Sequence, residues 1–431
     1  MNDAEKLRES LTYKNENGFK EVDDAGKKLI FDFCDGYKTF LNNGKTERAC
    51  VSQTIEAATA RGFHEYHRGE ALHAGDKIYA NNRGKSIILA VIGAKTPEEG
   101  IHIAASHIDA PCIHLKQNPL YEDSELGFFK THYYGGIKKY QWPAIPLELH
   151  GVIALKDGTT RDIAIGEDAS DPIFTITDLL PHLGKDQMNK TMLEAIPGES
   201  LNVLIGSEPV SGDKDGDLVK LNLLRILNEK YGIHETDFLS AELAAVPAFP
   251  ARDLGFDRSL IGAYGHDDRV CAYPSIQAIF DCNAPQLTAV CMLADKEEIG
   301  SEGVTGMQSA FFDTFIEDIC ETMGARLRVC FEKSSCLSAD VLAAYDPNFA
   351  DVFDKRNAAQ INHGVSLCKY TGSRGKSGAS DATAELVARM RRIFDASGVV
   401  WQMGQLGKVD QGGGGTVAMY MAKRNIDTID A

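Results

Sequence analysis

The chain has 431 residues, which is long enough for two domains that each bury a core. Hydrophobic residues make up 43% of it and charged residues 25%, a composition typical of ordinary globular proteins. The formal net charge of -17 argues against a nucleic acid or an anionic membrane as the main partner, whereas it would suit metal cations.

Two further features bear on where the protein works. The N-terminal stretch MNDAEKLRES is charged and lacks the apolar segment of a secretory signal, and the apolar run at 86–94 has about half the length that a membrane span requires. The ten cysteines form no CxxC pair, and several lie inside apolar runs, so we expect buried free thiols in a reducing compartment. Together these features predict a cytoplasmic protein.

The first elements along the chain alternate between helix and strand. Apolar residues at helical spacing predict a helix over 24–44, and the apolar runs at 85–94 and 100–109 predict two strands. From about 113 to 261, short alternating apolar runs are separated by Gly and Pro turn signals. This stretch therefore predicts an inserted, mainly β domain.

Helices and strands alternate again in the rest of the chain. We expect strands at 287–294, 326–331 and 399–403, and helices over 309–324 and 381–398. Strands that alternate with helices of this length are typical of an α/β fold with a mixed, largely parallel sheet flanked by helices.

Four polar clusters follow predicted strands or open predicted helices. They are His107-Ile108-Asp109, Asp267-Asp268-Arg269, Glu297-Glu298 and Asp340. In an open α/β sheet, the carboxyl ends of the strands form the ligand crevice. Acidic side chains that converge there repel one another unless a cation neutralises them. The clusters therefore predict a metal site.

The ligand types narrow the choice of metal. A histidine with carboxylates and no thiolate suits catalytic zinc, cobalt or manganese. The carboxylates outnumber those that one ion needs, which suggests two ions bridged by one carboxylate. Such a pair lowers the pKa of a shared water to about 7. Of the neighbours Glu297 and Glu298, one can then bind metal while the other takes a proton from the water.

Each pattern alone has a plainer interpretation. Adjacent glutamates are usually a solvated loop, HxD is often a surface turn, and DDR is often a helix N-cap with an ion pair. The glycine run 412–415 lacks the GxxxxGKS/T pattern of a phosphate-binding loop, which argues against a nucleotide site. The order of the clusters and their shared placement at strand ends favour one common site.

Taken together, the motifs resemble those of the aspartyl aminopeptidase and vacuolar aminopeptidase I family of di-zinc exopeptidases, most closely its bacterial, clostridial-type members. They occur in the family's order, as SHIDAP (106–111), HDDRVCAY (266–273), DKEEIGSEG (295–303), SAD (338–340) and GKVDQGGGGTVA (407–418). The resemblance covers nearly the whole chain. It implies a catalytic metallopeptidase domain of residues 1–112 and 262–431, interrupted by a dimerisation domain at 113–261.

The resemblance also implies the metal ligands. His107 matches the ligand of one ion, Asp267 the carboxylate that bridges both, and Glu298 and Asp340 the remaining carboxylate ligands. Two divalent ions per subunit are implied, with zinc as the first expectation and cobalt or manganese as alternatives.

Other residues match the family's catalytic and substrate positions. Glu297 matches the general base, and Asp109 matches the carboxylate that orients the histidine ligand. Lys369 and Gly415 lie near the stretches that bind the substrate's N-terminal residue. His182 lies where the family places histidines that reach a neighbouring subunit, although a surface or packed histidine is the plainer interpretation. The family implies a tetrahedral homododecamer built from dimers.

One departure concerns the last metal ligand of the family, a histidine in a Met-His stretch close to the C-terminus. The sequence ends at Ala431, before any such motif, and His363 lies in a different context upstream. Two interpretations stay open: the sequence is cut short, or this form lacks one ligand. A lost ligand would weaken one metal site.

The leading hypothesis is a metallo-aminopeptidase that removes the N-terminal residue from peptides. Two alternatives stay open, a metal-poor assembly protein without activity and a related metallohydrolase such as a deacylase. The preference for an acidic or a neutral N-terminal residue also stays open. Lys369 and Arg374 are the basic residues that would favour an acidic one.

Overall fold

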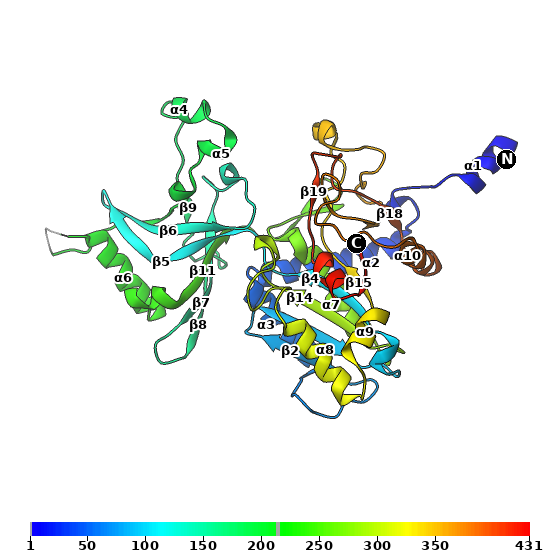
Figure 1. The fold of residues 1–431 in the computed structure, drawn as a ribbon. Helices are drawn as coiled ribbons and strands as arrows, with labels where there is room; N and C mark the ends of the chain where they lie inside the picture. Colours follow the sequence, from blue (N-terminus) through cyan, green and yellow to red (C-terminus); the bar gives the residue numbers. More distant parts are fainter. Residues whose placement is uncertain (1, 213–215) are drawn as a thin grey trace.

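The computed structural model describes residues 2–212 and 216–431. Figure 1 shows two lobes, each built around its own sheet, with the N-terminal helix α1 (Asp3–Leu11) projecting from the larger lobe. The larger lobe combines the beginning and the end of the chain, whereas the smaller lobe comes from its middle.

The larger lobe contains a mixed sheet, which has seven strands in the described part of the chain. In order across the sheet they are β1 (His64–Glu65), β2 (Lys77–Asn82), β3 (Ser86–Val91), β14 (Ala289–Ala294), β4 (His102–His107), β15 (Ser335–Ser338) and β20 (Asp427–Asp430). Strand β3 runs antiparallel to both of its neighbours, whereas β14, β4, β15 and β20 are mutually parallel. The predicted mixed, largely parallel sheet is confirmed.

Helices cover both faces of this sheet. One apolar core joins it to α2 (Asp24–Asn43), α3 (Glu47–Thr59) and α7 (His266–Asp281). A second core joins the opposite face to α8 (Phe311–Thr322), α9 (Leu327–Lys333) and α11 (Ala418–Lys423). Strand β3 alternates between them, since Ile88 belongs to one core and its neighbours Ile87 and Leu89 to the other. Helix α10 (Ala384–Ala396) packs on β20 through a smaller cluster.

The smaller lobe is an antiparallel sheet packed against helix α6 (Leu218–Tyr231). Its strands in the described residues are, in order, β8 (Thr160–Ile165), β7 (Leu147–Ala154), β11 (Ala241–Pro247), β5 (Cys112–Asp123), β6 (Leu126–Tyr134), β10 (Val203–Gly206) and β9 (Thr175–Ile176). The short helices α4 (Lys185–Met188) and α5 (Met192–Ala195) lie at its tip in Figure 1. The sheet lies where the sequence predicts an inserted β domain, and its role in dimerisation stays a prediction.

Three two-stranded ribbons complete the described strands. They are β12 (Arg252–Leu254) with β13 (Leu260–Gly262), β16 (Val365–Leu367) with β18 (Trp401–Met403), and β17 (Gly372–Ser373) with β19 (Gly413–Gly414). The strand predicted at 399–403 is therefore present as β18, although it pairs outside the main sheet.

The prediction of a strand at 326–331 is wrong, because most of this stretch belongs to helix α9 (Leu327–Lys333). Alternating apolar residues suggested a strand, but Leu327, Cys330 and Phe331 are also spaced to face one side of a helix. Burial of Cys330 and Phe331 against α8 decides for the helix. The strand beside β4 is instead β15, which lies between β4 and the edge strand β20 and whose serines hid it from the sequence pattern.

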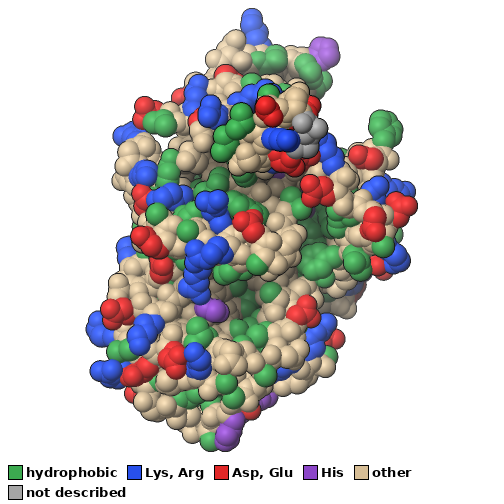
Figure 2. Space-filling model, turned by 90° about the vertical axis from the view of Figure 1, so that its right-hand side faces the viewer, with side chains coloured by type: hydrophobic (Ala, Val, Ile, Leu, Met, Phe, Trp, Pro, Cys, Tyr) green, Lys and Arg blue, Asp and Glu red, His purple; other side chains and the backbone are tan. Residues whose placement is uncertain are grey.

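The surface carries charges of both signs. In Figure 2 acidic and basic side chains are interspersed over the face shown, which is hollowed near its centre and has hydrophobic side chains in the recess. Across residues 2–212 and 216–431, no helix joins the length and the apolar character that a bilayer crossing demands.

Candidate metal centre and active site

The predicted polar clusters meet at one edge of the larger sheet. His107 is the last residue of β4, Glu297 and Glu298 follow β14, and Asp340 follows β15. Because β14, β4 and β15 are parallel neighbours, their carboxyl ends lie side by side. Asp267 reaches the same place from the first turn of α7.

His107 is held with one ring nitrogen aimed at the carboxylates. The side chain is 1% exposed, and its Nδ1 lies 3.1 Å from the Asp109 carbonyl oxygen and 3.3 Å from Asp109 Oδ1. Its Nε2 lies 3.2 Å from Asp267 Oδ1 and 3.8 Å from Glu297 Oε2, yet has no hydrogen-bond partner among the described atoms. A histidine held through Nδ1 in this way presents Nε2 as a ligand.

Asp109 is the hub of the hydrogen bonds behind this histidine. Its Oδ2 accepts from the Tyr134 hydroxyl at 2.7 Å and from the Glu298 N–H at 3.2 Å, while its Oδ1 accepts from the Glu297 N–H at 3.2 Å. Burial alone would raise the pKa of Asp109, but the His107 and Tyr134 hydrogen bonds hold it below its usual value. One ionised carboxylate thus orients the histidine and both glutamates.

Two groups of side chains place their oxygen or nitrogen atoms close enough to share an ion. His107, Asp267 and Glu298 form one group, and His107, Asp268 and Asp340 form the other, each with its ligand atoms within 4.8 Å of one another. Asp268 was part of the DDR cluster but was not predicted as a ligand. It is fully buried and accepts a hydrogen bond from the His107 N–H at 3.3 Å.

The protonation of these side chains reflects crowded negative charge. Burial and the neighbouring carboxylates raise the pKa of Glu298 to about 8 and that of Asp340 to about 7. Burial likewise raises the pKa of Glu297 and lifts that of Asp268 well above its usual value. A cation would replace these protons. One imidazole and several carboxylates without thiolate fit divalent zinc, cobalt or manganese.

A cleft of about 370 Å³ opens beside the acidic groups. Its lining includes the acidic residues Asp267, Glu297 and Asp340, the basic residues Arg374 and Lys376, and glycines 412–415. Strands β17 and β19 pair Gly372 with Gly414, which brings the stretch YTGSRGKSG (370–378) beside the glycine run. The predicted substrate position Gly415 therefore lies in the cleft.

Two other predicted substrate residues lie elsewhere. Lys369 is absent from the described lining of the cleft, and its Nζ donates to Asp381 Oδ1 at 2.5 Å and to the Ala382 carbonyl at 2.8 Å. His182 is exposed in a turn before α4 in the smaller lobe. Arg374, named as an alternative to Lys369, does line the cleft, together with the unpredicted Lys376.

Sequence reasoning missed Asp268, Tyr134 and Lys376. Asp268 had a signal, since it adjoins Asp267 in a cluster already singled out. Tyr134 had none, because it comes from β6 in the smaller lobe and reaches Asp109 only in the folded protein.

Comparison with known families gives a match over most of the chain. The family described as Aminopeptidase I zinc metalloprotease (M18) matches residues 40–431. A probable M18 family aminopeptidase 1 from Clostridium acetobutylicum is 48% identical over 428 residues, which are 97% of this chain and 92% of that protein.

Solved structures agree with this match. A crystal structure of an M18-family aminopeptidase from Thermotoga maritima has a TM-score of 0.92 at 43% identity, covering 97% of this chain and 92% of that one. Aminopeptidase I from Clostridium acetobutylicum gives a TM-score of 0.90 at 45% identity, covering 97% and 93%. The S. cerevisiae mApe1 dodecamer, at 21% identity and a TM-score of 0.73 over 93% and 89%, shares the fold.

Proposed function

This chain belongs to the aminopeptidase I zinc metalloprotease (M18) family, and on that premise we propose that its acidic cluster holds two divalent ions and that Glu297 is the general base. Family membership confirms the resemblance stated from the motifs, and with it a hydrolase that acts on N-terminal residues. The number of ions and the role of each residue are our proposal.

One observation carries the assignment of the two adjacent glutamates. Glu298 belongs to a potential metal group with His107 and Asp267, whereas Glu297 belongs to the lining of the cleft. Of the two neighbouring carboxylates, Glu298 thus belongs to a potential metal group, whereas Glu297 lies beside it, with Oε2 3.8 Å from His107 Nε2. The unpartnered Nε2 of His107 and the raised pKa of Glu298 both support a cation between them.

The ligands that we propose are His107, Asp267 as the bridge, Glu298 and Asp340. Divalent ions bound there would supply Lewis acidity, which acidifies water and polarises the scissile carbonyl. Zinc is the metal that the family name specifies, and cobalt or manganese would suit the same donors.

Glu297 would then move the protons. Its backbone N–H donates a hydrogen bond to Asp109, which holds the backbone of Glu297 in position, and Glu297 lines the cleft. There it can accept a proton from water and deliver it to the leaving amine. Burial raises the pKa of Glu297, and this makes its carboxylate a stronger base.

The substrate side and the assembly belong to the same proposal. The glycine run with Gly415 would leave room for the substrate's N-terminal residue, and Arg374 would supply positive charge beside it, whereas Lys376 lines the cleft but is paired with Asp381 at 2.8 Å. Lys369 would act by holding Asp381 rather than by touching substrate. We propose a homododecamer like that of S. cerevisiae mApe1, with the smaller lobe between subunits and His182 directed to a neighbour.

The test uses Glu297→Gln on zinc- or cobalt-loaded protein with Asp-, Glu-, Leu- and Lys-p-nitroanilide. We expect turnover to disappear while two ions per chain remain. Turnover equal to that of the parent would refute the role of Glu297. A folded parent protein that takes up almost no metal would point to the metal-poor assembly protein, and cleavage of N-acetylated substrates alone would point to a deacylase.

A further inference from the structure

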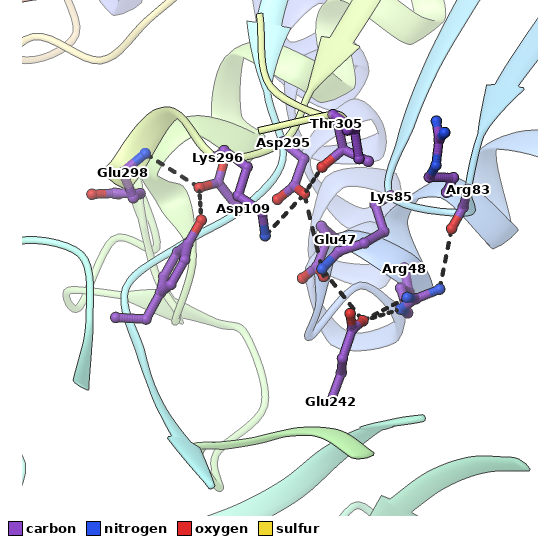
Figure 3. Close-up of polar contacts among 12 residues, drawn as sticks. Glu47, Arg48, Arg83, Lys85, Asp109, Glu242, Asp295, Lys296, Glu298 and Thr305 are labelled. Atoms are coloured by element: carbon purple, nitrogen blue, oxygen red, sulfur yellow. Dashed lines mark hydrogen bonds and ion pairs between the residues drawn. The ribbon is translucent and has the colours of Figure 1, made fainter. Parts of the chain in front are cut away.

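A cluster of ion pairs lies beside Asp295, at the start of the glutamate loop (Figure 3). We call it the Lys85 cluster, and its members are Lys85, Glu47, Arg48, Glu242 and Asp295. Lys85 Nζ lies 3.1 Å from Glu47 Oε1, 3.4 Å from Glu242 Oε2 and 4.0 Å from Asp295 Oδ2. Arg48 donates twice to Glu242 Oε2, at 2.9 Å and 2.5 Å.

The cluster joins parts of the chain that are far apart in sequence. Arg48 and Lys85 belong to the larger lobe, whereas Glu242 belongs to β11 of the smaller lobe. Asp295 directly follows β14 and precedes Lys296, Glu297 and Glu298. The cluster therefore connects the second sheet to the segment that carries the proposed base and ligand.

Burial makes the geometry of the cluster costly to disturb. The side chain of Asp295 is 1% exposed and that of Lys85 is 12% exposed. A buried charge that loses its partner is strongly destabilised, so these groups hold one another in place. Burial alone would raise the pKa of Glu242, but Lys85 and Arg48 keep it below its usual value.

Asp295 closes the base of the loop 295–306. Its Oδ2 accepts a hydrogen bond from the Thr305 hydroxyl at 2.6 Å, and its N–H donates to the Thr305 carbonyl at 3.4 Å. The same Oδ2 lies 3.2 Å from Lys296 Nζ, which in turn lies 5.6 Å from the ring centre of Tyr134. Both ends of the loop are thus tied to one carboxylate.

From these contacts we propose that Asp295 and Thr305 are positioning residues, and that the Lys85 cluster uses them to fix Glu297 and Glu298 at the metal centre. The inference rests on the proposed roles of those two glutamates. Neither Asp295 nor Thr305 lines the described cleft or belongs to a potential metal group, so they act through the loop. Glu242 couples the loop to the smaller lobe.

The first test compares Thr305→Val with Thr305→Ser. Valine keeps the shape of the side chain but removes the hydroxyl that donates a hydrogen bond to Asp295, whereas serine keeps this hydroxyl. We expect Thr305→Val to lower kcat about tenfold with KM within about twofold, and to weaken cobalt(II) binding about tenfold, as loss of a partner behind a ligand does. Thr305→Ser should restore both values. Thr305→Val with the kcat and the cobalt affinity of the parent overturns the proposal.

A second pair decides the matter if Thr305→Val fails to fold. Glu242→Gln removes the charge that pairs with Lys85 and Arg48. Glu199→Gln is the matched control, because Glu199 also pairs with two cations, Lys116 at 2.9 Å and Lys130 at 3.0 Å, and neither of these pairs includes a residue of the loop 295–306. We expect kcat of Glu242→Gln to fall about threefold, since solvent screens its half-exposed charge. A kcat equal to that of Glu199→Gln overturns the proposal.

The same assay separates this inference from the proposed function. If Glu297→Gln still turns over substrate, the assignment of Glu297 as the general base is refuted. If Glu297→Gln is inactive while Thr305→Val behaves like the parent, only the proposed positioning role of Asp295 and Thr305 is refuted. Cobalt affinity is measured without substrate, so it reports on Glu298 independently of turnover.

Discussion

Replacing Asp109 with asparagine tests whether one carboxylate organises the whole centre. Asparagine keeps the size of the side chain but turns one oxygen into an N–H₂ donor. Asp109 accepts from Tyr134, from the N–H groups of Glu297 and Glu298, and from His107, so at least one of these donors would face another donor. At 2% exposure, water cannot substitute.

The magnitude follows from these contacts. A hydrogen bond to a charged group contributes about 1.5–3 kcal/mol, and a buried unpaired donor costs about 1–3 kcal/mol. We take about 3 kcal/mol as the part that reaches the transition state, which corresponds to about a hundredfold lower kcat/KM. Metal affinity should fall about 10–100-fold because the histidine ligand loses its orienting partner.

The assay measures kcat/KM at saturating zinc and cobalt(II) affinity by competition with a chelator. Tyr134→Phe is the control, because it removes one donor and leaves the carboxylate, and it should cost about tenfold or less. Asp109→Asn with kcat/KM and metal affinity within about threefold of the parent would refute the argument that Asp109 orients the site.

Three further predictions follow. Glu298→Gln should lower the metal content from two ions to about one per chain by elemental analysis, and an unchanged content would exclude Glu298 as a ligand. In metal-free protein, the pKa of Glu298 at about 8 and that of Asp340 at about 7 exceed their unfolded values of about 4.3 and 3.9, so the folded state binds more protons between those limits. The free energy of unfolding should therefore decrease as pH rises from about 4 to 8, and urea titrations that show an increase would contradict this. Arg374→Ala should raise KM for Asp-p-nitroanilide about tenfold more than KM for the Leu substrate, since Arg374 lines the cleft, and equal changes would exclude it from specificity.

Much of the larger lobe could be predicted from local patterns. The helix expected over 24–44 is α2, and the apolar runs before His107 and before Glu297 are parallel neighbours in the sheet. Because parallel strands present their carboxyl ends at one edge of the sheet, the polar residues that follow these strands lie close together there. The pattern failed at 326–331, where the same residues satisfy both strand and helix spacing and only tertiary packing decides.

The contacts that tie the site to the smaller lobe could not be predicted in this way. Tyr134 meets Asp109, and Glu242 meets Lys85, only because the second sheet packs against the first. Their sequence separations carry no periodic signal, since each contact joins separate elements. A single sequence therefore identifies the residues at strand ends but not the partners that hold them.

The two adjacent glutamates show how local geometry assigns different tasks. Lys296 has a φ of +71°, and Glu297–Ile299 form a 3-10 helix. With about three residues per turn, successive side chains in such a helix point about 120° apart, so neighbouring carboxylates cannot share a direction. Asp109 accepts the N–H groups that begin this turn, which otherwise lack helical partners. The orienting carboxylate of the histidine thus also fixes the turn from which both glutamates approach His107, with Glu297 Oε2 3.8 Å from Nε2 and Glu298 in the group that could share an ion with it.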